Sequence, residues 1–228
     1  MTIPQLRDTL RRRAIRMQVG GFRPPDSPSA SWFGRASLAL PGESWPTTEG
    51  RAMHALCQIN TTELPFRPAG LEDVELVTVF VGPSELPDDT PNGVSWCLRA
   101  YPRLDALVPL AAAATGSPIR AFPMSPEVVE NDFPCMDDVA IPLPAGVEDR
   151  YEELFPNTGG IKLGGWPTLV QGEVDWGRRA SPDAPRYVFQ VDSVEKAGWS
   201  WGDMGVGYFG RGTAPGRAGE WALSWQCY

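Results

Sequence analysis

Histidine and cysteine are scarce in this sequence. It has one histidine, His54, and four cysteines that lie far apart and form no Cys-x-x-Cys pair. One imidazole cannot build a metal site of several histidines, and a Ser-His-Asp triad would have to use His54. The cysteine spacing indicates neither a zinc site nor a disulfide framework, so we expect reduced, mostly buried thiols and no cofactor.

Long apolar runs are also missing. No run approaches the roughly 18–20 residues that a helix needs to cross a bilayer, so no membrane span is expected. The segment Met1–Met17 contains five arginines that no apolar stretch follows, which is unlike a secretory signal. These absences predict a cytoplasmic protein that does not bind a membrane.

Glycine and proline, by contrast, are abundant. The 228 residues include 24 Gly and 24 Pro, and 42% of the chain is hydrophobic. So many turn-forming residues argue against a helical bundle, while the apolar content is sufficient for a large core. The composition therefore favours a β-rich globular protein of one or two domains.

Negative charge is concentrated in one segment. The net charge is −8, and residues 121–160 alone carry nine acidic residues against Arg150. Residues 1–20 are basic, with five arginines against Asp8. An acidic surface repels nucleic acid and attracts basic partners, so direct binding to DNA or RNA is not expected.

The spacing of apolar residues predicts two helices and several strands. Residues 2–17 have apolar side chains at helical intervals, and Gly20-Gly21 would end that helix. Residues 104–114 are a second helix candidate, which Pro109 must begin or kink. Short β-type runs occupy residues 36–40, 55–59, 76–81 and 94–100.

The order of these runs recurs in the second half of the chain, where four short matches lie 129–132 residues further on. This spacing predicts an α+β fold, mainly antiparallel β-sheet, built from two duplicated β-rich units with an N-terminal helix and a few short helices. The predicted parts are an N-terminal helix (1–22) and a domain (23–228) with a first repeat (about 31–101), an acidic connector (about 121–160) and a second repeat (about 161–228). The matches are Phe33-Gly34 with Leu163-Gly164, Leu56–Asn60 with Val188–Asp192, Val79-Phe80 with Tyr208-Phe209, and Ser95-Trp96 with Ser224-Trp225.

Three patterns resemble catalytic or ligand-binding motifs. The spacing of Gly205, Gly207 and Gly210 matches a dinucleotide fingerprint, but the Gly- and Pro-rich residues that follow cannot open a helix, so strand or turn glycines are favoured. His54 and Cys57 lie three residues apart, which on a strand places them on opposite faces. Adjacent acidic residues lack the pattern of a calcium loop. We therefore assign no catalytic residue and no metal ligand.

Six of the nine tryptophans follow residue 160. Trp199 and Trp201 fall in the turn-like sequence Gly198–Asp203, where an exposed indole can anchor an interface. Packing of both rings in the core is the alternative.

Four segments carry a set of motifs found together elsewhere, at residues 57–65, 162–168, 189–192 and 201–209. As a set they resemble the YwqG-like bacterial family, a domain of unknown function, and the resemblance covers roughly residues 31–228. The first half departs from the family at Phe33-Gly34-Arg35, where a Gly-Gly pair is expected. The resemblance implies an immunity protein encoded beside polymorphic and type VI secretion toxins, including DNA-cleaving toxins. No catalytic residue is established for its motifs.

Charge and resemblance together predict an immunity protein and not an enzyme. It would bind a cognate secreted toxin, a nuclease with a basic groove for DNA, and occlude the toxin's active site. The alternatives are a small-molecule-binding or enzymatic domain with a cleft between the two repeats, and a structural or regulatory scaffold. Composition does not indicate an oligomeric state. The expected toxin-binding residues are Asp132, Asp137, Asp138, Glu148, Asp149, Glu152 and Glu153, with Trp199 and Trp201 as anchors.

Overall fold

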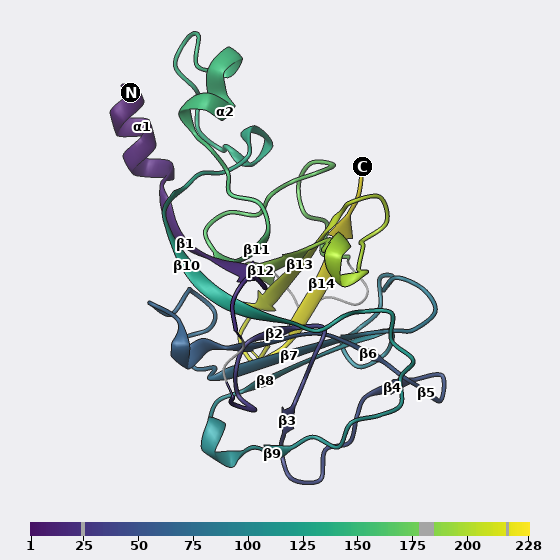
Figure 1. Cartoon of the computed structure of the whole chain (residues 1–228). Helices are drawn as coiled ribbons and strands as arrows, with labels where there is room; N and C mark the ends of the chain where they lie inside the picture. The colour runs from purple at the N-terminus through teal and green to yellow at the C-terminus, as the bar shows by residue number, and fades with distance from the viewer. Residues whose placement is uncertain (24–25, 178–184, 218) are drawn as a thin grey trace.

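The computed structural model of the chain contains one large antiparallel β-sheet of ten strands (Figure 1). It describes residues 1–23, 26–177, 185–217 and 219–228. The predicted mainly antiparallel fold is confirmed, since every registered pair of neighbouring strands runs antiparallel. In spatial order the strands are β14 (Trp221–Gln226), β13 (Val206–Gly212), β12 (Pro185–Asp192), β11 (Ile161–Gly164), β1 (Arg12–Val19), β10 (Phe122–Asp132), β2 (Trp32–Phe33), β6 (His54–Asn60), β7 (Leu76–Val81) and β8 (Trp96–Tyr101).

The helices are short, and none within the described ranges has the length and apolar character needed to cross a bilayer. Thr2 begins α1 with a capping box, because its hydroxyl accepts from the N–H of Gln5 while the Gln5 side chain accepts from the N–H of Thr2. The remaining elements pair β3 (Leu38–Ala39) with β9 (Val108–Pro109) and β4 (Thr47–Thr48) with β5 (Arg51–Ala52). The helical elements are α1 (Ile3–Leu10), α2 (Tyr151–Leu154) and the 3-10 turns η1 (Thr61–Glu63), η2 (Leu104–Ala106), η3 (Met136–Asp138), η4 (Glu148–Arg150) and η5 (Glu195–Ala197).

The N-terminal helix is shorter than predicted. It ends at Leu10, and β1 then lies at the centre of the sheet between β10 and β11. Ile15 and Met17 are buried while Arg16 between them is exposed, which is the two-residue period of a strand. Pairing on both sides satisfies the backbone of β1, and this tertiary context overrides the helix propensity of its arginines.

One further prediction was wrong, and the segment predicted as an acidic connector contains a strand. Residues 104–114 form no α-helix, because η2 is followed by the two-residue strand β9, whose Pro109 has no N–H to continue a helix. The acidic connector begins with a central strand, since β10 occupies its first third and pairs with β1 and β2. The predicted strands at 55–59, 76–81 and 94–100 are confirmed as β6, β7 and β8.

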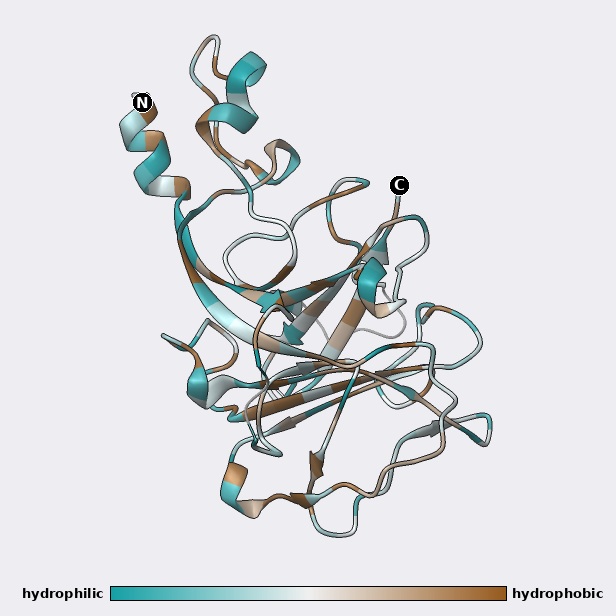
Figure 2. Cartoon of the chain, viewed as in Figure 1, coloured by the Kyte–Doolittle hydropathy of each residue, from teal (hydrophilic) through white to brown (hydrophobic). Residues whose placement is uncertain are grey.

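The sheet curls around one main hydrophobic core. Figure 2 shows hydrophobic residues along its strands, and within the core the rings of Phe189 and Phe209 stack at 4.5 Å between centroids. The two edges of the sheet approach each other, because Trp96 of β8 packs edge-on against Phe209 at 6.3 Å. The indole N–H of Trp225 in β14 also donates to the carbonyl of Pro87, at 2.6 Å. The sheet is therefore nearly closed.

A second, smaller hydrophobic cluster forms a lobe that projects from the sheet. In Figure 1, α1 and the chain around α2 extend beyond one end of β1 and β10. Leu6 and Leu10 of α1 pack there with Phe133, Tyr151 and Phe155. We call α1 together with residues 133–156 the acidic lobe, because most of the acidic segment lies on it.

Candidate functional site

The acidic lobe is held together by an arginine from the basic N-terminus. The guanidinium of Arg7 donates to the carbonyl of Leu154 and lies over the ring of Phe133, 4.6 Å from its centroid. The same cation is 5.8 Å from the centroid of Phe155. A guanidinium on an aromatic face is attracted by the ring quadrupole, so α1 and the acidic segment stabilise each other.

Substitution of Arg7 by alanine should loosen the lobe without unfolding the sheet. Loss of the hydrogen bond and of the ring contacts is expected to destabilise the lobe by about 1–2 kcal/mol. Hydrogen exchange should therefore become faster in residues 133–156 and stay unchanged in β12–β14. Arg11→Ala is the matched control, because the Arg11 side chain is exposed. Equal exchange in the two variants would contradict this role of Arg7.

An ion pair lies beneath the lobe, at the root of the acidic segment. The Nζ of Lys162 is 3.1 Å from Oδ2 of Asp132, and both side chains are fully buried. Asp132 also accepts from the N–H groups of Thr158 and Trp166, each at 2.8 Å. Burial lowers the pKa of Lys162, and the charge of Asp132 opposes that shift. The prediction that Asp132 is part of an exposed acidic surface is therefore corrected: it holds a loop instead.

The polar groups around this pair satisfy one another. Lys162 Nζ also lies 3.3 Å from Oγ1 of Thr168 and 3.4 Å from Oδ1 of Asn157. The Thr168 hydroxyl is 2.6 Å from the same Asn157 oxygen. A network whose donors and acceptors are already used stiffens the structure around it. These residues support the pocket that lies above them.

That pocket, which we call the acidic pocket, has a volume of about 730 Å³. Cys135, Asn157 and Thr168 are among its lining residues, and Arg150 on its rim forms an ion pair with Glu153 at 2.9 Å. The other three acidic side chains of the rim form no ion pair within the described part of the chain. The exposed acidic residues that line the pocket are Glu148, Asp149, Glu152 and Glu153.

Asp137 and Asp138 belong to the same lobe, on η3. Asp137 is exposed, whereas Asp138 is half-buried. Burial raises the pKa of Asp138, the negative charge of Glu173 adds to the shift, and the guanidinium of Arg12 opposes it. Met136 beside them is 50% exposed, which places an apolar side chain next to the acidic residues. Six of the seven predicted acidic residues thus lie on one lobe with some exposed surface.

The two predicted tryptophan anchors differ in exposure. Trp201 is fully buried, so its expected place in an interface is corrected, while Trp199 is half-buried and packs edge-on against it at 5.0 Å.

A Cβ on Gly207 would overlap the Trp201 ring, and one on Gly210 would lie 2.7 Å from the ring of Trp176. The glycine spacing in β13 therefore makes room for indoles, which confirms the reading of strand glycines.

Burial shifts the pKa values of two cysteines and of the histidine toward their neutral forms. Burial raises the pKa of the Cys57 thiol to about 12 and also raises the pKa of the Cys135 thiol, although the N–H of Leu169 opposes the shift at Cys135. Burial lowers the pKa of His54, helped by the charge of Arg51. Protonated thiols are weak nucleophiles. Among the described residues, no three His, Cys, Asp or Glu side chains are grouped so that they could hold a metal ion.

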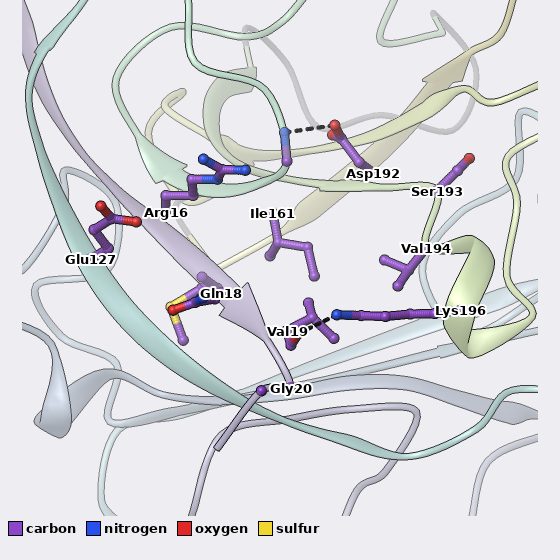
Figure 3. A pocket seen from close by; sticks show the side chains of 13 residues that line it. Arg16, Gln18, Val19, Gly20, Glu127, Ile161, Asp192, Ser193, Val194 and Lys196 are labelled. Carbon is purple, nitrogen blue, oxygen red and sulfur yellow. Dashed lines mark hydrogen bonds between the residues drawn. The ribbon is translucent and has the colours of Figure 1, made fainter.

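A second pocket, which we call the charged pocket, lies where β1 and β10 approach the end of β12 (Figure 3). Its volume is about 430 Å³. The carboxylate of Asp192 accepts from the N–H of Gly160 at 2.7 Å and from the Gln190 amide at 2.9 Å. Burial raises the pKa of Asp192 to about 6, while those two donors and the charges of Lys162 and Arg16 oppose the shift. Sequence reasoning missed this pocket. In the sequence analysis Asp192 appears only as the last residue of the repeated run Val188–Asp192.

Substitution of Asp192 by asparagine should change how stability depends on pH. The folded protein holds the Asp192 proton more tightly than the unfolded chain does, so this carboxyl stabilises the fold below about pH 4 and loses that contribution as the pH rises to about 6. Asparagine does not titrate. The wild type should therefore lose up to about 3 kcal/mol relative to Asp192→Asn between those pH values. Urea denaturation of both proteins from pH 4 to pH 7 measures the difference, and a difference independent of pH would contradict the assignment.

Comparison with known families identifies one match. Residues 106–210 match the profile of a family described as "Domain of unknown function (DUF1963)". The matched stretch is slightly less than half of the 228 residues and extends from η2 into β13, so it contains the acidic pocket but neither α1 nor β1. No curated protein matches the chain.

Proposed function

We propose that the protein is a cytoplasmic immunity protein that binds a cognate secreted toxin through its acidic lobe. The observation that carries the proposal is the rim of the acidic pocket, where exposed carboxylates lie together with Arg150, the one basic residue among the described residues of the lining. A nuclease needs a basic groove for phosphate, and carboxylates can occupy that groove by the same electrostatic attraction. The resemblance to the YwqG-like family supports this choice of partner.

The shape of the lobe supports the same proposal. It projects from the sheet and carries Met136, an exposed apolar side chain, beside the acidic residues. Interfaces commonly combine a desolvated apolar contact with a charged rim. The partner would contact the acidic lobe, while the buried Lys162–Asp132 pair fixes the position of the loop beneath it.

The proposal is tested with the protein encoded by the gene beside this one. Expression of that neighbour should stop bacterial growth, and co-expression of this protein should restore it. The purified pair should associate quickly at low salt, and the association rate should fall steeply as salt is added, because screening weakens charge steering. A harmless neighbour that does not bind, or an association rate independent of salt, would count against the proposal.

A second candidate function is the binding of a small molecule between the two halves of the sheet. The observation that favours it is the charged pocket, which lies at the junction of the central strands β1 and β10 with the β11–β12 half. The two functions use different residues, so one protein can have both.

We also propose that the two halves arose by duplication. The strand order places β11–β12–β13–β14 on one side of the central β1–β10 pair and β2–β6–β7–β8 on the other. Each half also has a buried glutamine with equivalent hydrogen bonds. Gln58 Oε1 accepts from the N–H of Ser37, and its side-chain amide donates to the carbonyl of Ala30. Gln190 Oε1 accepts from the N–H of Thr168, and its side-chain amide donates to the carbonyl of Gly160. Gly34 and Gly164, which follow β2 and end β11, both have a positive φ, 72° and 69°. When the two halves are aligned by strand register, Trp96 of β8 corresponds to Trp221 of β14. The repeat in the sequence had matched Trp96 with Trp225 instead.

A further inference from the structure

The charged pocket contains charges of both signs that are not paired with one another. Arg16 and Lys196 line it together with Glu127 and Asp192. Arg16 and Glu127 are direct cross-strand partners of β1 and β10, yet no ion pair joins these four groups in the described structure. Lys196 donates instead to the carbonyl of Val19. Opposite charges that surround a pocket without forming ion pairs with one another remain able to bind a ligand.

The carboxylate of Asp192 has a fixed position in this pocket. Each of its oxygens accepts one hydrogen bond from the protein, from Gly160 or from Gln190, and can accept another. Figure 3 shows the Arg16 side chain extending toward Asp192. A Cβ on Gly160 would lie 3.4 Å from Nε of Arg16, so glycine at this position leaves room for the guanidinium. The pocket therefore presents to the same space a fixed carboxylate and a guanidinium that has no ion-pair partner among the described residues.

These charges are not required by the geometry of the sheet. Arg16 of β1 pairs with Lys162 of β11, and the corresponding pair in the other half of the sheet is Pro123 of β10 with Trp32 of β2. Asp192, two residues after Gln190, corresponds in the same way to Asn60. The other half thus has uncharged residues at both positions and keeps the same strand pairing.

We propose that the charged pocket binds a small zwitterion of the amino-acid or dipeptide type, with its ammonium at Asp192 and its carboxylate at Arg16. A guanidinium can bind a carboxylate through two parallel hydrogen bonds. The half-buried side chains of Val19 and Val194 line the same pocket and favour an apolar ligand side chain. A volume of about 430 Å³ accommodates a ligand of this size. None of the acidic-lobe residues takes part, so this site is independent of toxin binding.

Four compounds test whether both charges are needed. Leucine and glycyl-leucine have an ammonium and a carboxylate at two different spacings, N-acetylleucine lacks the ammonium, and leucinamide lacks the carboxylate. Isothermal titration should show binding of leucine or of glycyl-leucine, and the two blocked compounds should bind about tenfold more weakly or worse. Absence of binding by all four at millimolar concentration would overturn the proposal. Equal binding of either blocked compound would also overturn it, since one charge would then suffice.

Two variants test the assigned residues. Arg16→Gln and Asp192→Asn should each weaken binding of the zwitterion by about tenfold or more. Arg35→Gln is the control, because Arg35 is exposed and lies over the ring of Trp32 in the other half of the sheet. Circular dichroism establishes that each variant is folded, and if Asp192→Asn is not, Arg16→Gln decides alone. Unchanged affinity in a folded Arg16→Gln variant would overturn the assignment.

Discussion

Replacing Lys162 with methionine is expected to lower the free energy of unfolding by about 3–5 kcal/mol. Methionine removes the ammonium group that lies 3.1 Å from the Asp132 carboxylate, in a place where both side chains are fully buried. Asp132 would then be a buried carboxylate whose remaining hydrogen bonds, within the described part of the chain, come from the N–H groups of Thr158 and Trp166. The loss should appear as a lower urea midpoint in equilibrium denaturation.

Two controls separate the ion pair from the lysine stem. Lys196, the only other lysine of the chain, is exposed, so Lys196→Met should change the free energy of unfolding by less than about 1 kcal/mol. Adding Asp132→Asn to Lys162→Met should restore part of the lost stability, because no buried charge remains unpaired. A loss below about 1 kcal/mol for Lys162→Met would show that the pair does not stabilise the fold.

Sequence reasoning placed best those strands whose own residues have high β-propensity along the whole run. The run that became β7 is entirely apolar or β-branched and is buried at every position, so its pattern needed no partner to be recognised. β1 was missed because three of its first five residues are arginines, and its alternation was masked by apolar spacing that also fits a helix. Only the neighbouring strands β10 and β11 decide between the two, and they are distant in sequence.

The same distinction applies to the candidate sites. Glu148, Asp149 and Glu152 could be predicted as surface acidic residues because their neighbours along the chain are also charged or polar. Asp132 could not be separated from them by composition, since Lys162 lies 30 residues further on and only folding brings the two together. One available signal was that Asp132 precedes Phe133, an aromatic residue that the lobe buries. The charged pocket combines the ends of β1 and β12, so no local motif predicts it.

Reversing the charge of the four carboxylates on the rim of the acidic pocket is expected to abolish protection against the proposed toxin. The change replaces attraction to a basic groove with repulsion, and affinity should fall by about 100-fold or more, mainly through slower association. These residues are exposed and lie outside the sheet, so the variant should fold. Growth of cells that express the toxin and the binding rate of the purified pair are the two measurements. The residues changed to lysine are Glu148, Asp149, Glu152 and Glu153.

The matched control changes the net charge by the same amount at other places. Its residues are exposed, lie outside the acidic lobe and form no ion pair within the described ranges. If total charge governed binding, this control would lose affinity as the rim variant does, because long-range steering depends on the whole charge distribution. Retained protection by the control together with its loss in the rim variant would place the contact on the lobe, whereas full protection by a folded rim variant would remove the lobe from the interface. The control residues are Glu49, Glu63, Glu85 and Glu195.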